Sequence, residues 1–170
     1  MLESISLVPI LAPAALALAA LISYLNPGLR PTWALRATRF ASLLAGLVAI
    51  ASAVILSKSA TSLVSPLFGI GGIGFSFRLD PLSALMLFLV TSLGIFVIQF
   101  SRNYLDGDSR QGVFLGDLSL TLVGVTLLVL SGNLFHLVFA WIGTSLALHR
   151  LLLFYRHRTC LLYTSDAADE

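Results

Sequence analysis

Five apolar stretches of about 20 residues run through this sequence, and an α-helix needs that length to cross a bilayer. Because a backbone in lipid must satisfy its own hydrogen bonds, such stretches fold as helices. Charged residues make up only 11% of the chain, too few to cover a water-soluble domain of 170 residues. We therefore predict an all-α, multi-pass integral membrane protein. The predicted spans are Ile5–Leu25, Thr38–Ser57, Pro81–Ser101, Val113–Ser131 and Leu134–Tyr155.

The basic residues predict how these spans are oriented, since lysine and arginine are enriched in cytoplasmic loops. Only Lys58 and Arg78 lie between the second and third spans, whereas eight arginines lie near the opposite span ends. This bias predicts an N-terminus outside the membrane and a cytoplasmic chain end. We interpret three of the eight as topology anchors: Arg150, Arg156 and Arg158.

The segment between the second and third spans is too rich in Gly and Pro to cross the membrane as a helix. Its last part, Phe75-Ser76-Phe77-Arg78-Leu79, alternates apolar and polar residues as a half-buried strand does. We expect a short extended segment or hairpin on the outer surface. The "GIGGIG" run within it opens no βαβ unit, so we interpret it as a surface turn rather than a nucleotide site.

Ionisable residues inside the spans are the first candidates for function, because a charge in lipid is costly. Asp117 lies about one turn inside the fourth span. It can be an interfacial carboxylate favoured by the positive end of the helix dipole. It can instead face the other helices as a proton relay or a packing group. His136, at the outer end of the fifth span, is expected at the membrane interface.

His149 lies deeper in the fifth span, and its ring titrates near neutral pH. Ser145 precedes it by one helical turn and Ile142 by two, so the three residues form a stripe. The stripe can carry protons if it faces a wet cavity, or it can bind a neighbouring helix through its polar groups. Our proton-path candidates are therefore His149, Asp117 and Ser145.

The sequence offers no sign of an active site of its own. It has one cysteine, Cys160, and no cluster of residues typical of a metal centre or of a nucleophile with its base. We expect no cofactor and no metal in this chain. The basic residues are few and scattered, which argues against a nucleic-acid partner.

Two stretches resemble a known superfamily. "FSFRLDPLSALMLFLVTSLGIFVIQFSRNYL" resembles the N-terminal module of the antiporter-like membrane subunits of respiratory complex I, above all subunit L of NADH-quinone oxidoreductase. "LVLSGNLFHLVFAWIGTSLALHRLLLFY" resembles the region where the proton-translocating core of that family begins. The resemblance implies an N-terminal module of three helices at residues 1–111 and the start of the core at residues 112–159. It also implies a bacterial inner membrane as the location.

One departure from the respiratory subunits stands out. There, the tryptophan of the fifth helix is followed by a glutamate central to proton translocation, whereas Trp141 is followed by Ile142. The pattern from Trp141 to Tyr155 resembles instead the membrane subunit of the DAB inorganic-carbon uptake complex. That resemblance implies a large cytoplasmic zinc-binding partner related to carbonic anhydrases. It also implies that a cation gradient through the membrane subunit drives conversion of CO2 to bicarbonate in that partner.

The last eleven residues, Cys160–Glu170, match the translation of a transposase adapter used in sequencing libraries. We therefore expect residues 160–170 to be non-native and the chain to be a fragment of a longer subunit. Three functions remain open at this stage. They are a proton-coupled subunit for inorganic-carbon uptake, which we favour, the corresponding subunit L of complex I, and a small membrane scaffold without transport.

Overall fold

The structure is a computed structural model that describes residues 8–28, 31–59, 63–70 and 73–155. In this part of the chain, five helices are long and apolar enough to cross a membrane, which confirms the predicted number and class of elements. The short helix η1 (Val8–Ile10) leads into α2 (Leu11–Leu25), and η2 (Leu153–Tyr155) ends the described chain. The other long helices are α3 (Thr32–Ser59), α4 (Pro81–Tyr104), α5 (Gln111–Val129) and α6 (Leu134–Leu152).

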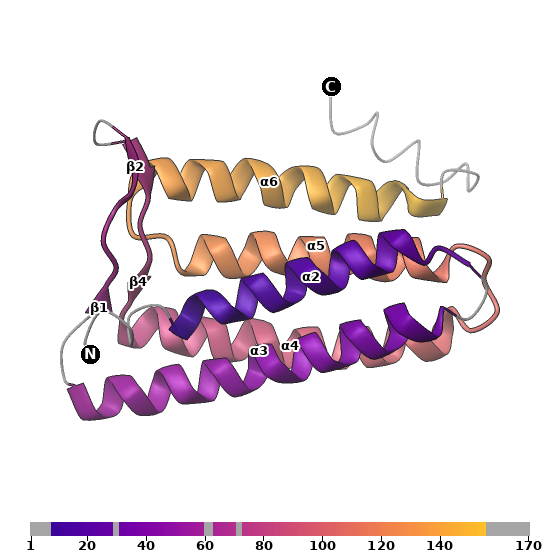
Figure 1. Ribbon diagram of the computed structural model, residues 1–170, viewed down its shortest axis with the longest axis horizontal. Helices are drawn as coiled ribbons and strands as arrows, with labels where there is room; N and C mark the ends of the chain where they lie inside the picture. Colours follow the sequence, from indigo (N-terminus) through magenta and orange to yellow (C-terminus); the bar gives the residue numbers. More distant parts are fainter. Residues whose placement is uncertain (1–7, 29–30, 60–62, 71–72, 156–170) are drawn as a thin grey trace, which may run out of the picture.

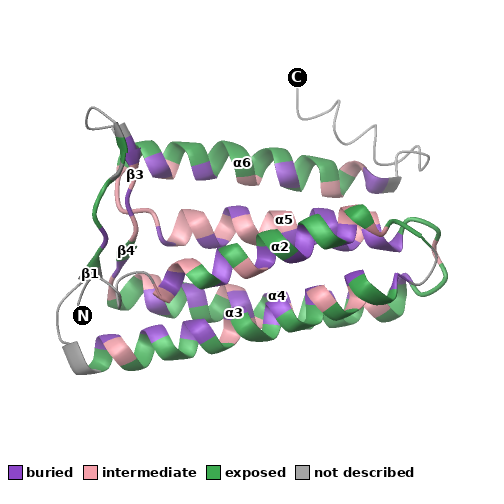
Figure 2. Ribbon diagram, in the orientation of Figure 1, coloured by how far each residue is buried: buried purple, intermediate pink, exposed green. Residues whose placement is uncertain are grey.

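The long helices lie side by side along the long axis of the molecule, and α2 crosses the others obliquely (Figure 1). Helix α2 packs against both α3 and α5, and α4 packs against α3 and α5. Helix α6 lies at the edge of this bundle, where its main helical neighbour is α5. Most of the α6 surface is consequently exposed, whereas α5 is largely covered (Figure 2).

Small side chains allow the helices to approach closely, as is usual where lipid removes the hydrophobic drive for helix association. Ala41, Ala45 and Ala49 of α3 are buried, and Ala12 and Ala19 of α2 belong to the same cluster. Several hydroxyl groups inside the bundle are satisfied within their own helices, whereas those of Ser52 and Ser119 have no hydrogen-bond partner among the described residues. The residues that donate to the carbonyl four positions earlier include Ser23, Thr38, Thr91, Thr126 and Thr144.

The segment between α3 and α4 contains two short antiparallel pairs, which confirms the predicted hairpin. Strand β1 (Leu63–Val64) pairs with β4 (Arg78–Leu79), and β2 (Phe68–Ile70) pairs with β3 (Ile73–Phe75). The pairs stand across one end of the bundle and reach the start of α6 (Figure 1). The location of this end outside the membrane stays a prediction.

The predicted alternation from Phe75 to Leu79 is wrong in one respect, because Ser76 is buried and the segment is not one continuous strand. The reason is a contact with the turn between α5 and α6. The Gly132 N–H donates to the Ser76 carbonyl oxygen at 2.8 Å, and the Arg78 N–H donates to the Leu130 carbonyl oxygen at 3.0 Å. A Cβ atom at Gly132 would lie 2.9 Å from that Ser76 oxygen, so the approach requires glycine.

Two side chains fix the starts of α4 and α6. Asp80 accepts a hydrogen bond from the Ser83 N–H at 2.7 Å, and Pro81 occupies the first helical position, as the sequence predicted. This hydrogen bond, with a smaller attraction from Arg78, holds the pKa of Asp80 below its ordinary value although partial burial opposes the shift. Asn133 caps α6 in the same way through the His136 N–H at 2.7 Å.

Most helix boundaries differ from the prediction by a few residues, because the prediction relied on apolar length alone. Helix α3 begins at Thr32 rather than Thr38, because a helix can continue past the apolar region through residues that reach the interface. Helix α5 ends at Val129 rather than Ser131, since the next residues pair with the hairpin segment. The last turn of the fifth span is the 3-10 helix η2.

Candidate functional site

The most unusual side chain inside the bundle is the carboxylate of Asp117. It lies in the second turn of α5 and is only 4% exposed. The side chain thus faces the other helices, as in one of the two alternatives; the depth of Asp117 in the membrane and its role stay predictions. A carboxylate buried at this depth needs partners, because an unpaired buried charge is strongly destabilising.

The first partner is Tyr24 of α2, which sequence reasoning missed. Its hydroxyl donates to Asp117 Oδ1 at 2.6 Å, a short hydrogen bond of the charge-assisted type. Gly116 makes room for this contact, since a Cβ atom there would lie 3.1 to 3.2 Å from three atoms of the Tyr24 ring. A tyrosine at the end of an apolar span is ordinarily an interfacial residue, so its sequence position alone gave no signal.

The second partner is Arg150 of α6. Its Nε lies 3.4 Å from Asp117 Oδ1, and its guanidinium lies 5.6 Å from the centre of the Tyr24 ring. Three helices therefore contribute one residue each to a cluster of hydroxyl, carboxylate and guanidinium. The Arg150 side chain is 60% exposed, so water or lipid headgroups can reach the cluster from the α6 side. Its predicted role as a topology anchor stays a prediction.

His149 lies beside this cluster. It borders a pocket of about 340 Å³ together with Asp117 and Arg150, near the start of α5 and the end of α6. Arg110 and Phe154 close another side of the pocket, and the Arg110 guanidinium lies 4.8 Å from the centre of the Phe154 ring. The structure thus brings together two of the three proton-path candidates, His149 and Asp117.

Ser145, the third candidate, does not line that pocket. It lies on the exposed side of α6, as do Trp141 and Ile142. The predicted stripe of Ile142, Ser145 and His149 is therefore present on an open helix face. Its role in proton transfer or in helix packing stays a prediction.

His136 is a buried residue. It lies at the start of α6, as expected, and its side chain is 1% exposed and faces the hairpin segment; its depth at the membrane interface stays a prediction. Its Nδ1 lies 2.8 Å from the Ser76 carbonyl oxygen, and its ring meets the edges of Phe75 and Phe77 at centroid distances of 5.3 and 4.9 Å. This histidine joins the hairpin to α6.

Two other predicted residues, Arg156 and Arg158, lie outside the described residues, as does the segment 160–170. In the described ranges, no group of three or more His, Cys, Asp or Glu side chains could hold a metal ion.

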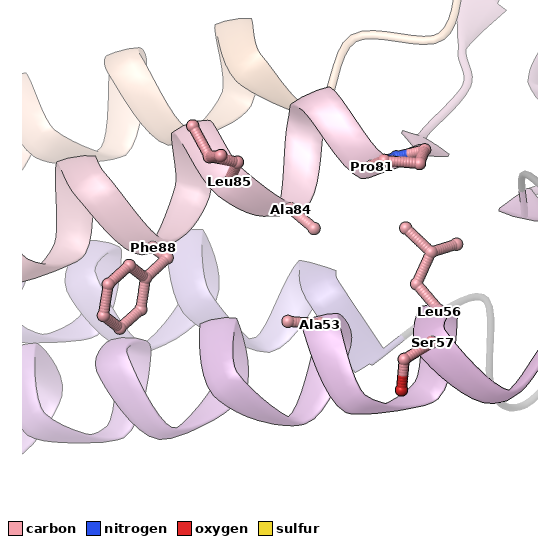
Figure 3. Close-up of a pocket in the computed structure, with 7 residues that line it drawn as sticks. All are labelled: Ala53, Leu56, Ser57, Pro81, Ala84, Leu85 and Phe88. Atoms are coloured by element: carbon pink, nitrogen blue, oxygen red, sulfur yellow. The ribbon is translucent and has the colours of Figure 1, made fainter.

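Two other pockets of the described chain are mainly apolar and offer little chemistry. One of about 430 Å³ lies between the end of α3 and the start of α4, lined by Ala53, Leu56, Ser57, Pro81, Ala84, Leu85 and Phe88 (Figure 3). Its one hydroxyl, on Ser57, already donates to the Val54 carbonyl oxygen at 2.8 Å. A second, of about 520 Å³, is an apolar groove between α5 and α6 that ends at His149 and Arg150.

Comparison with known proteins places the central part of the chain in a family. Residues 68–115 match the family described as NADH-ubiquinone oxidoreductase (complex I), chain 5 N-terminus. This range covers the β2–β3 pair, all of α4 and the first turn of α5.

Several relatives support the same assignment. The chain is 45% identical over 65 residues to NAD(P)H-quinone oxidoreductase subunit 5 of Chara vulgaris chloroplasts, which covers 38% of this chain and 10% of that protein. It is 37% identical over 90 residues to "Probable inorganic carbon transporter subunit DabB2" of Halothiobacillus neapolitanus, a match that covers 53% of this chain and 16% of that protein. It is 35% identical over 81 residues to NADH-quinone oxidoreductase subunit L of Pseudomonas aeruginosa, a match that covers 48% of this chain and 13% of that protein.

The chain thus matches between 10% and 16% of the length of these three relatives. They carry the names of two different complexes, and the identities do not separate the two groups. The family match, the relatives and the five helices long enough to cross a membrane agree: the described chain is similar to the antiporter-like membrane subunits, a superfamily that contains complex I subunit 5, subunit L and DabB.

Proposed function

We propose that this chain supplies helices to a proton-coupled membrane subunit, and that Asp117 is the proton-carrying group within it. The single observation that supports this proposal most is the buried Asp117 carboxylate, shared between Tyr24 and Arg150 on two other helices. An ionisable side chain inside a membrane helix is costly, so its presence with dedicated partners favours a role in proton movement.

The geometry suggests how a proton would move. In the ion-paired state, Asp117 accepts from Tyr24 and attracts Arg150. A proton on the carboxylate removes the attraction for Arg150, whose exposed side chain can then turn towards solvent. His149 borders the same pocket, so its imidazole can relay protons between solvent and Asp117. The steps use side chains of this chain alone and need no cofactor.

We favour an inorganic-carbon uptake complex over respiratory complex I. The support is the apolar Ile142 at the position after Trp141, where the respiratory pattern has a glutamate, together with the match to a relative named as an inorganic carbon transporter subunit. The partner in this proposal is a large cytoplasmic zinc-binding subunit related to carbonic anhydrases, in a bacterial inner membrane. The matches to subunit L keep complex I as the second candidate.

A growth experiment tests the proposal. The reading frame that carries this sequence is expressed with its neighbouring genes in a bacterium that lacks carbonic anhydrase, so that growth in air requires inorganic-carbon uptake. We expect growth in air with the wild type and its loss with Asp117→Asn. The matched control Asp108→Asn makes the same change in the turn after α4, where the amide oxygen can still accept from the Arg110 N–H, and should leave growth intact.

The outcomes separate the candidate functions. Growth that survives Asp117→Asn would refute the assignment of the carboxylate. Adjacent genes for respiratory subunits instead of a zinc-binding protein would favour complex I, and the same two variants would then be compared for NADH-driven proton pumping. A stable protein with neither activity would favour the scaffold function.

A further inference from the structure

A second polar site lies at the same end of the bundle as Asp117 but between other helices. A pocket of about 430 Å³ is formed where α3 begins, α4 ends and α5 begins, lined by Leu35, Arg102, Asn103, Asp106 and Gln111. It shares no lining residue with the pocket of Asp117 and His149. The pocket therefore needs an explanation of its own.

Two buried polar atoms on residues that line this pocket have no hydrogen-bond partner. They are Nε of Arg102, a donor, and Oε1 of Gln111, an acceptor. Gln111 is 1% exposed, and its Nε2 donates to the Arg102 carbonyl oxygen at 2.9 Å. That bond fixes the amide orientation, because a flipped amide would set two carbonyl oxygens against each other. Buried polar groups in native proteins are almost always paired, so these two atoms indicate a missing partner.

The charges around the pocket indicate which kind of partner is missing. Arg39 of α3 is close enough to act electrostatically on Arg102, and the two positive charges repel. Among the described residues, no ion pair joins Arg102 to a carboxylate; its NH1 donates to the Gln99 side chain at 3.3 Å. Asp106 borders the pocket but is engaged in an interaction of its own. An anion between Arg39 and Arg102 would relieve their repulsion.

We propose that this pocket binds a phosphate group that carries or adjoins a hydroxyl. Arg102 binds the phosphate, Arg39 adds positive charge from outside the pocket lining, and Gln111 Oε1 accepts the hydrogen of the hydroxyl. Water can satisfy the two unpaired atoms but cannot offset two guanidinium charges, and the pocket volume far exceeds the roughly 30 Å³ of one water molecule. Inorganic phosphate has this chemistry, and so has the phosphatidylglycerol headgroup, which anionic bilayers present at helix ends.

Thermal unfolding of the purified 170-residue chain in neutral detergent tests the proposal, followed by circular dichroism. One arm adds inorganic phosphate, with chloride at equal ionic strength as its control. The other adds phosphatidylglycerol, with phosphatidylcholine as its control. A ligand that binds the folded state raises the unfolding midpoint, by about a few degrees when its concentration far exceeds its dissociation constant.

Arg102→Gln should abolish the rise in the midpoint. Arg39→Gln, on an exposed side chain, should reduce it and serves if Arg102→Gln does not fold. Arg110→Gln is the matched control, because it removes one charge from the same end of the bundle outside this pocket, and it should keep the full rise.

A response to phosphate but not to lipid identifies a small anion as the ligand, and the reverse identifies a headgroup. No rise with either ligand would overturn the proposal. The proposal would also be overturned if Arg102→Gln and Arg110→Gln reduced the rise in the unfolding midpoint equally. That result would mean that the anion is attracted by the overall charge of the chain and not by a defined site.

Discussion

The contact between Tyr24 and Asp117 makes a quantitative prediction about which partner of the carboxylate matters more for stability. The Tyr24 hydroxyl lies 2.6 Å from Asp117 Oδ1, and the carboxylate is buried. A hydrogen bond to a buried charged group contributes about 1.5–3 kcal/mol. Tyr24→Phe removes only the hydroxyl and keeps the ring that lies beside Gly116 and Arg150. We expect it to lower the free energy of unfolding by that amount.

Arg150 should contribute less in spite of its full charge. Its Nε lies 3.4 Å from the carboxylate, and its side chain is 60% exposed, so solvent screens the attraction. Exposed ion pairs contribute about 0–1 kcal/mol. We therefore expect Arg150→Gln to cost less than Tyr24→Phe. The double variant Tyr24→Phe/Asp117→Asn should show an interaction energy of about 1–2 kcal/mol, because the two residues form one contact.

The assay is reversible unfolding of the purified chain in mixed micelles at increasing mole fractions of sodium dodecyl sulfate, followed by circular dichroism. Tyr104→Phe, at the exposed end of α4, is the matched control and should change the unfolding free energy by less than about 0.5 kcal/mol. The reasoning is refuted if Arg150→Gln costs as much as Tyr24→Phe, or if the double variant shows no interaction energy.

Three further outcomes follow from close contacts and caps. Gly124→Ala should destabilise the chain by about 1–3 kcal/mol, because its Cβ would lie 2.5 Å from Thr144 Oγ1, whereas Gly143→Ala meets nothing within 4 Å and should be neutral or slightly stabilising in the same unfolding assay. Asn133→Ala removes the cap of α6 and a hydrogen bond to the Gly74 carbonyl oxygen in the hairpin. We expect it to lower the free energy of unfolding by about 1–3 kcal/mol and to speed amide hydrogen exchange in the hairpin. Unchanged exchange would contradict the contact. The pKa of Asp80 is lowered in the folded chain, so the stabilising effect of its carboxylate is complete above the ordinary pKa and is lost as pH falls through the lowered pKa. The loss of unfolding free energy in Asp80→Asn at pH 7 should therefore shrink below about pH 4. A loss that stays constant with pH would refute this linkage.

The spans and the hairpin could be predicted from the sequence because their signals are local. Apolar length identifies a membrane helix, and glycine and proline between two such lengths exclude another one. Asp80 and Pro81 mark the start of α4 within two adjacent residues. The helix boundaries were misplaced by two to six residues, because polar residues at helix ends can remain helical at the interface and because the end of α5 instead pairs with the hairpin.

The cluster could not be predicted, because its contacts join distant parts of the chain. Tyr24 and Asp117 are 93 positions apart, and His136 and Ser76 are 60 apart. The sequence indicated that Asp117 was costly in lipid, but not which helices would surround it. For His136 the same limit hid the burial of its side chain against the hairpin, since a histidine at a span end fits a membrane interface as well as a protein interior.

The contact between the hairpin and the α5–α6 turn sets an order of events during synthesis. Strands β3 and β4 leave the ribosome before α5 and α6 are made, yet the Ser76 carbonyl finds its donors only at Gly132 and His136. The strand pairs can form by themselves, but this carbonyl must stay bonded to water until the α5–α6 turn and the start of α6 have been made. Docking of the hairpin on that turn would then report that α5 is in place, and a probe of Ser76 accessibility during translation would detect that moment.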